Sequence, residues 1–392
     1  MKILNKVLTL TALTVGMAAV SAQDYELTFS NKTSTNIVDY TKTKTEGASK
    51  SASKFSGISN KAEAELLSER VDIGAMAEFT FSPVQTTEEA LSETDHDGFS
   101  FELSDYDYYI EFRPIHQITL GYRSAVYAWG SYLPVWDDNL AGANFTTSEG
   151  LSVVVRPIDD LRIGAGFEPS TFGLDKKQNE DEEKVEKLKP IINLGADYNF
   201  QNLVKAGFAL RNVAGSWNYN EEDDDFEERK LGFGAFVEAD PIEGLVLNLG
   251  FAHNDYDGIG FALIDNLDLF SLQGENIATL GASFEQGPLT LALDTAFNFK
   301  ADGETDGDAF YDTYIGASVG FNVTEDINVS LTGIFGIDRD SANTDKADTY
   351  IGVNPSASFT FAEHHEVGVG FQFEKAGDYS AFNFPIYYKY SF

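Results

Sequence analysis

The sequence predicts an all-β protein, a transmembrane antiparallel β-barrel of about 18 strands, on three observations. The first 22 residues have the layout of a secretory signal peptide, tight turns recur about every forty residues, and the last strand has one almost wholly aromatic side. We therefore expect a signal peptide over 1–22 and a single barrel domain over 23–392.

The N-terminus is basic and then apolar. Lys2 and Lys6 precede an apolar run from Val7 to Val20, and small residues follow before a cleavage point after Ala22. A buried N-terminal helix is the alternative, but it does not explain the three parts together. Without the two lysines the net charge of -36 becomes about -38, and the mature chain is expected to be exported.

Composition excludes several classes of protein. No later stretch approaches the roughly 18 apolar residues of a membrane-spanning helix, so any membrane crossing must use strands. The chain has no cysteine, which removes disulfides and cysteine metal sites as sources of stability. Its strong acidity and lack of a basic patch argue against nucleic acid as a partner.

Short turns followed by alternating strands recur along the chain. Three of them begin with Pro-Ile, and five more share the layout without that pair; the eight segments start at Leu67, Pro114, Pro157, Asn199, Pro241, Phe284, Phe321 and Phe361. A spacing of about 38 to 46 residues fits two strands per unit, each long enough to cross hydrocarbon at a tilt. The alternative is a β-propeller, which needs four strands per unit.

The strands before and after these turns alternate with a period of two. Over 315–322, for example, one side is Ile, Ala, Val and Phe and the other is Gly, Ser, Gly and Asn. A face of small and polar residues cannot form a dry core, so the apolar face is expected outside. A soluble sandwich would use both faces within about 100 residues rather than repeat the pattern along the whole chain.

Long acidic stretches at 86–97, 176–187, 221–229 and 301–312 separate the hairpins. Short turns at one end and long polar loops at the other are typical of outer-membrane barrels. Eight turns, a first strand near 24–34 and a last strand at 381–392 give eighteen strands, with a range of 16 to 20 because 254–276 can hide another hairpin.

The chain ends in NFPIYYKYSF, and this ending resembles the C-terminal assembly signal of Gram-negative outer-membrane proteins. The signal is carried by Phe392, Tyr390, Tyr388 and Ile386. With the barrel pattern over 23–392, it makes the chain similar to porin-type channels. The resemblance implies a location in the outer membrane, in contact with its lipid and lipopolysaccharide. It also implies recognition by the barrel assembly machinery and, as is common among such porins, assembly as a homotrimer.

Charges expected to face the lumen form two strips. Arg113, Arg123, Arg156 and Arg162 make a basic strip, and Glu63, Glu65, Asp72, Glu78, Asp107 and Glu111 make an acidic strip beside it. In general porins an acidic third external loop folds inward against arginines. The third loop here is 129–149, and the resemblance implies that Asp137 and Asp138 occupy the pore constriction opposite the four arginines. Wall charges paired locally for packing are the alternative.

The function implied is a water-filled diffusion channel for small hydrophilic solutes and ions. An eighteen-strand bore is too wide for side chains to fill, and the strand at 25–30 begins so soon after the cleavage point that we expect no N-terminal plug. Acidic mouths favour a cation preference. We expect no cofactor; Ca²⁺ or Mg²⁺ at acidic loops such as 223–225 and 302–308 is a weaker hypothesis than a solvated charge run.

Two other classes stay open. Some outer-membrane barrels are hydrolases that use a histidine near the outer rim, and only His253, followed by Asp255 and Asp257, lies at that height. A histidine satisfied at a strand end is the simpler interpretation, and we expect no enzyme. A surface adhesin or structural barrel is the remaining alternative, because long loops can carry binding functions.

Overall fold

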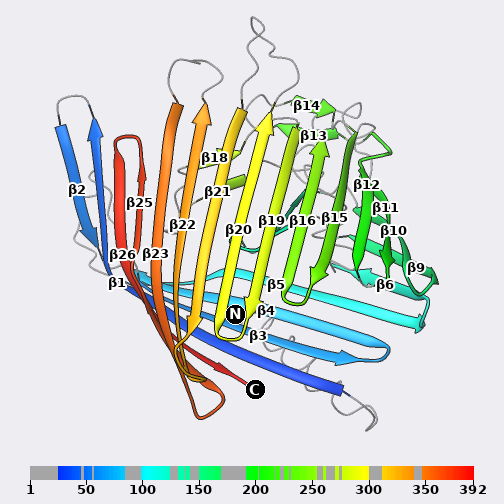
Figure 1. Cartoon of the computed structure of the whole chain (residues 1–392), viewed down its shortest axis with the longest axis horizontal. Helices are drawn as coiled ribbons and strands as arrows, with labels where there is room; N and C mark the ends of the chain where they lie inside the picture. Colours follow the sequence, from blue (N-terminus) through cyan, green and yellow to red (C-terminus); the bar gives the residue numbers. More distant parts are fainter. Residues whose placement is uncertain are drawn as a thin grey trace, which may run out of the picture.

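A computed structural model describes residues 25–45, 48–54, 57–83, 99–123, 131–136, 138–141, 150–168, 191–201, 203–215, 217–220, 225–228, 231–253, 259–261, 270–272, 276–299, 311–339 and 347–392. Every regular element in these ranges is a β-strand (Figure 1). No helix among them is long and apolar enough to span a membrane. The predicted signal peptide lies outside the described residues.

Twenty strands form one sheet that closes on itself, because β1 pairs antiparallel with β26. The strands are β1 (Tyr25–Thr45), β2 (Ala48–Lys54), β3 (Ile58–Ser68), β4 (Val71–Pro83), β5 (Phe99–Ile115), β6 (Ile118–Tyr122), β9 (Leu151–Ile158), β10 (Leu161–Glu168), β11 (Ile191–Phe200), β12 (Val204–Arg211), β15 (Gly232–Ile242), β16 (Leu245–His253), β19 (Asn276–Gln286), β20 (Leu289–Phe299), β21 (Tyr311–Asn322), β22 (Ile327–Arg339), β23 (Ala347–Phe361), β24 (His365–Gly370), β25 (Gln372–Ala376) and β26 (Tyr379–Ser391).

The barrel wall has 18 strands, because two wall strands are each interrupted once. β2 and β3 both pair with β1, and β24 and β25 both lie between β23 and β26. At the second break, Phe371 still donates its N–H to the carbonyl of Pro355 at 3.0 Å. The predicted closed antiparallel barrel is confirmed, and a continuous ring excludes the four-stranded blades of a propeller.

All eight predicted short turns are present, between β3 and β4, β5 and β6, β9 and β10, β11 and β12, β15 and β16, β19 and β20, β21 and β22, and β23 and β24. Turn chemistry explains one of them directly. Gly244 has φ +81°, and a Cβ there would overlap the carbonyl of Glu285 on the neighbouring strand. Most of the long acidic stretches at the other end lie outside the described residues.

The two faces of the wall follow the alternation in the sequence. Outward side chains such as Leu249, Leu293 and Phe335 are exposed, whereas the lumen side carries glycine, serine, asparagine and charged residues. Two lumen tyrosines pack over a glycine of a neighbouring strand. Tyr109 covers Gly74, and Tyr387 covers Gly368, so a larger residue at either glycine would overlap the ring.

The ring closes at the C-terminal strand. Phe392 and Phe29 exchange both backbone hydrogen bonds at 3.0 Å, and their rings lie 5.5 Å apart. Tyr388 and Phe392 remain partly exposed on the outer surface. A closed ring has no unpaired edge, which is the condition for strands in hydrocarbon.

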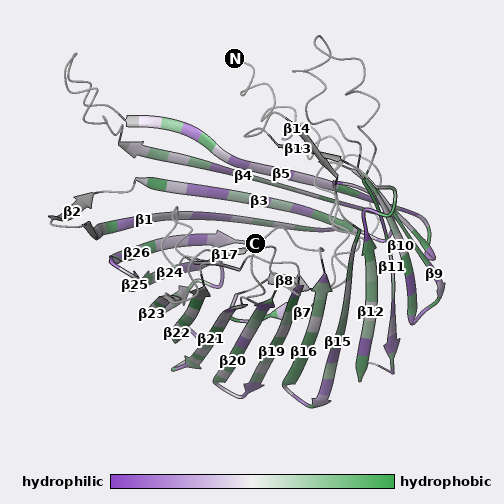
Figure 2. Cartoon of the chain, turned by 90° about the horizontal axis from the view of Figure 1, so that it is seen from above, coloured by the Kyte–Doolittle hydropathy of each residue, from purple (hydrophilic) through white to green (hydrophobic). Residues whose placement is uncertain are grey.

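Two further hairpins belong to no wall strand. β17 (Ile259–Phe261) pairs β18 (Phe270–Leu272), so 254–276 does contain the suspected hairpin, but as a separate sheet that does not change the wall count. β7 (Ser131–Leu133) pairs β8 (Asp138–Ala141) within the predicted third loop. Figure 2 places β7 and β8 inside the ring, beside β16 and β19. A third small pair, β13 (Trp217–Asn220) with β14 (Asp225–Glu228), lies in an acidic stretch.

Candidate functional site

The inward hairpin, β7 and β8, packs on the lumen side of β15, β16, β19 and β20. Its foot is apolar: Leu133 is fully buried, and Trp136 packs edge-on against Tyr314 with ring centroids 6.2 Å apart. These side chains join one buried cluster with Ala252, Ile277, Ala296, Ile334 and Tyr350. The hairpin approaches β19 closely at Gly281, where any larger residue would place its Cβ against the carbonyl of Tyr132.

A single carboxylate fastens the hairpin to the wall. Asp294 on β20 is fully buried, and its Oδ2 accepts the backbone N–H groups of Val135 and Trp136 at 2.7 and 2.8 Å. Its other oxygen, Oδ1, makes no hydrogen bond within the described residues. Two charge-assisted bonds onto a β-turn fix both the position and the direction of the chain. The described part of the loop is therefore held against the lumen side of the wall at the level of Asp294.

The third loop thus folds inward, but its described part is anchored on the side of the ring away from β3, β4 and β5 (Figure 2). Asp137 and the side chain of Asp138 lie outside the described residues, so their place in the constriction stays a prediction. Of the predicted partners, Arg113, Arg156 and Arg162 lie within three residues of the short turns, whereas Asp294 lies midway along β20.

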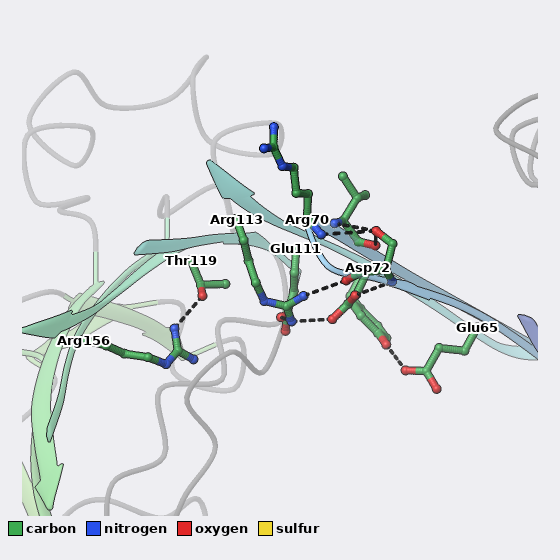
Figure 3. A network of polar contacts seen from close by, with 10 residues as sticks. Glu65, Arg70, Asp72, Glu111, Arg113, Thr119 and Arg156 are labelled. Carbon is green, nitrogen blue, oxygen red and sulfur yellow. Dashed lines mark hydrogen bonds and ion pairs between the residues drawn. The ribbon is translucent and has the colours of Figure 1, made fainter. Parts of the chain in front are cut away.

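The six predicted acidic residues lie on three adjacent strands, with Glu63 and Glu65 on β3, Asp72 and Glu78 on β4, and Asp107 and Glu111 on β5. The strand register places their side chains on the lumen side. Arg113 connects two of them (Figure 3): it donates to Asp72 and, at 3.1 Å, to Glu111, which is the cross-strand partner of Asp72. It also donates to the carbonyl of Ser68 at 3.3 Å.

Each of the other four carboxylates of the strip has a different partner. Glu63 accepts from Lys61 at 2.7 Å and from the hydroxyl of Ser30 at 3.0 Å. Glu65 accepts the hydroxyl of Tyr109, which lies over Gly74. The remaining two, Glu78 and Asp107, bind Ser59 and Arg123 respectively, the latter at 3.2 Å. Among the described ion pairs, three cations (Lys61, Arg113 and Arg123) face these six carboxylates, so the strip keeps a negative charge.

The arginines differ in how their charge is used. Arg162 pairs with Asp197 at 3.2 Å, and Arg123 pairs with Asp107 and stacks 4.5 Å over the ring of Tyr108. Arg156 donates to the hydroxyl of Thr119 at 2.8 Å and pairs with no carboxylate in the described part of the chain. Local pairing therefore accounts for most of the basic strip, leaving Arg156 as its most available charge.

His253 occupies the end of β16 on the outward face. Its Nδ1 is 2.9 Å from Oδ1 of Asn276, and its ring lies 5.2 Å from that of Phe233. A hydrogen-bonded histidine against an outward phenylalanine fits a satisfied strand-end residue rather than a catalytic one. Asp255 and Asp257, its proposed partners, lie outside the described residues, as do 302–308 and most of 223–225.

Sequence reasoning missed Asp294 as a functional residue. One local signal was available: LTLALDTAF places a single carboxylate among alanines on the lumen side of its strand. What it binds, however, lies 159 positions earlier in the chain. Only the folded ring brings the two together.

Comparisons with known proteins give a likeness of structure alone. No protein-family model and no curated protein matches the chain. Among solved structures it is similar to OccAB4 of Acinetobacter baumannii (11% identity, TM-score 0.51, covering 94% of this chain and 99% of that chain). It is also similar to OccK7 (OpdD) of Pseudomonas aeruginosa (10%, 0.54, 95% and 99%) and to a BenF-like porin of Pseudomonas fluorescens Pf-5 (10%, 0.53, 94% and 98%). The fold is that of Gram-negative outer-membrane porins, and it indicates the outer membrane as the location.

Proposed function

We propose that this chain forms a water-filled channel in the outer membrane for the diffusion of small hydrophilic solutes and ions. The observation that carries the proposal is the inward hairpin fastened by Asp294, because it narrows a bore that eighteen strands leave too wide to fill with side chains. Apart from the apolar cluster beneath the hairpin and the lumen tyrosines, the side chains that face the bore are mainly small, polar or charged, as an aqueous path requires.

The channel prefers cations. The acidic strip on β3, β4 and β5 keeps a net negative charge after its three cations are counted, and the whole chain carries a formal charge of -36. Carboxylates along a low-dielectric wall raise the local cation concentration. Asp137 and Asp138 would add to this field at the constriction, facing the strands of Arg113, Arg123, Arg156 and Arg162.

Solute selection is expected to differ from that of one structural neighbour. Pseudomonas aeruginosa OpdK was solved with vanillate, a carboxylate, at 10% identity and a TM-score of 0.51 to this chain. Here the described acidic strip opposes a carboxylate, and of the four arginines predicted for the basic strip only Arg156 has no carboxylate partner among the described residues. Small neutral or cationic solutes are the class that this lumen suits.

The proposal includes no catalysis and no cofactor, with divalent cations at the acidic loops as the weaker hypothesis. It includes recognition of Phe392, Tyr390, Tyr388 and Ile386 by the barrel assembly machinery, lipopolysaccharide as a neighbour in the outer leaflet, and assembly as a homotrimer. A surface adhesin or structural barrel is the alternative function, followed by a hydrolase at His253.

Single-channel conductance of the refolded protein in a planar bilayer, with the reversal potential under a salt gradient, tests the proposal. Stepwise openings with a cation-directed reversal are expected. Asp107→Asn, and separately the pair Asp137→Asn and Asp138→Asn, should shift the reversal toward anions, whereas Asp326→Asn in a short turn should not. A folded barrel without conductance would overturn the channel and favour the adhesin.

A further inference from the structure

The outward face of β1 and β3 carries a polar island where the rest of the barrel is apolar. Asn31, Thr33 and Thr35 on β1 share the outward side with Leu27 and Phe29. Asn60 on β3 is the cross-strand partner of Thr33. Elsewhere on the described strands, the outward face is mainly aliphatic or aromatic. Thr295 is an isolated exception, and its hydroxyl donates to the carbonyl of Tyr314 at 2.9 Å.

The amides of the island bind one another. Asn31 Nδ2 donates to Asn60 Oδ1 at 3.1 Å, and Asn60 Nδ2 donates to Asn31 Oδ1 at 3.0 Å and to Thr33 Oγ1 at 2.8 Å. Each amide group has two N–H donors and two acceptor positions on its oxygen. These bonds leave one N–H of Asn31 and one acceptor position on each amide oxygen without a partner within the island.

Beside the amides lies a block of alanines. Ala62 and Ala64 on β3 pair with Ala77 and Ala75 on β4, so the surface there is shallow. Tyrosines border it on both sides: Tyr388 and Tyr390 on β26 pair with Thr33 and Asn31, and Tyr106 and Tyr108 on β5 pair with Ala77 and Ala75. Figure 2 shows β1, β3, β4 and β5 running side by side along one wall.

Apolar residues close the island toward both membrane surfaces. Leu27 lies on the side of the short turns and Ile37 and Ile58 on the other, and all three are exposed. The polar groups thus lie between two apolar levels of the outward face. Unsatisfied amides in hydrocarbon are costly, whereas small residues with a few polar groups are typical of contacts between membrane-spanning segments.

We propose that this face, formed by Asn31, Thr33, Asn60 and the four alanines, binds a second copy of the chain. Copies inserted in the same orientation place the same island at the same depth, so their amides meet about an axis along the membrane normal; an unrelated partner has no such match. The inference rests on the self-assembly proposed above and names its surface. It does not depend on whether the channel conducts.

Cross-linking through introduced cysteines tests the surface, because the chain has none of its own and any disulfide must join two chains. Ala62→Cys, Ala64→Cys, Ala75→Cys and Ala77→Cys, each oxidised in native outer membranes, should give covalent dimers at one or more positions. Leu293→Cys, outward in the middle of β20, is the control. Equal dimer yields at Leu293, or none across the four alanine positions, would overturn the proposal.

Loss of the amides gives an independent measurement. Asn31→Leu with Asn60→Leu should shift the monomer–oligomer equilibrium toward monomer by about tenfold or more, and folding is preserved because apolar side chains suit the lipid face. Thr33→Leu should act in the same direction and Thr295→Leu should not. If wild type assembles and these variants assemble equally well, the surface is wrong; if wild type is monomeric, self-assembly fails while conductance still decides the channel.

Discussion

Replacing Asp294 by alanine should release the inward hairpin from the barrel wall. Its buried carboxylate accepts two backbone N–H groups, from Val135 and Trp136. A hydrogen bond to a charged group contributes about 1.5–3 kcal/mol. With water replacing part of the loss, the attachment should weaken by about 2–4 kcal/mol, which changes the ratio of attached to detached hairpin by about 30- to 900-fold.

Two assays measure the release. Single-channel recordings of the Asp294→Ala variant should show a larger unit conductance, and liposome swelling with neutral sugars of increasing size should show a higher size limit. Asp294→Asn should give an intermediate result, because its amide oxygen still accepts a hydrogen bond without the charge. Trp136→Ala should act in the same direction as Asp294→Ala, since it removes part of the apolar foot.

Thr290→Ala is the matched control, on the lumen side of the same strand but next to its short turn. It should leave both quantities at wild-type values. A folded Asp294→Ala barrel with the conductance and size limit of wild type would refute the reasoning, because the hairpin would then be held by other contacts. Its reversal potential should remain cation-directed in either case, since the acidic strip is untouched.

Arg113→Ala should destabilise the barrel by about 1–2 kcal/mol, because Asp72 and Glu111, directly opposite on neighbouring strands, lose their shared cation. The loss of stability should appear as a lower temperature at which the folded band disappears on semi-native gels. Gly74→Ala should lower that temperature too and slow assembly, because the new methyl group overlaps the ring of Tyr109.

Each of these two changes has a compensating variant. Adding Asp72→Asn to Arg113→Ala removes one of the opposed charges and should recover most of the lost stability. Adding Tyr109→Ala to Gly74→Ala removes the overlap, and Gly320→Ala is a control because a Cβ there meets only ordinary contacts. Stability that stays low in the double variants would mean that the paired carboxylates and the covered glycine are not the causes.

Much of the fold was predictable because it is encoded locally. Alternation over 315–322 and the Pro-Ile turns each act within about ten residues, and together they predict the strand order and the short-turn end. The orientation of the last strand was predictable for the same reason, since the alternation of its aromatic residues determines which side of β26 faces outward. The hairpin at 254–276 was predicted only as an alternative that widened the range of strand counts. Its three-residue strands are too short for the sequence to distinguish them from the end of a wall strand.

The site depended on contacts that parity does not encode. Asp294 and Trp136 meet across the bore, and no spacing in the chain relates them. The polar island could not be recognised from the sequence for a different reason. Asn31 and Thr33 keep the period of two of their strand, so one strand alone does not distinguish a partner-facing stripe from a lipid-facing one. Only the register between β1 and β3 sets Asn31 and Thr33 against Asn60, with exposed apolar residues above and below. A polar row that continues across two strands between two apolar levels of the outward face requires a physical reason, and contact between copies provides one.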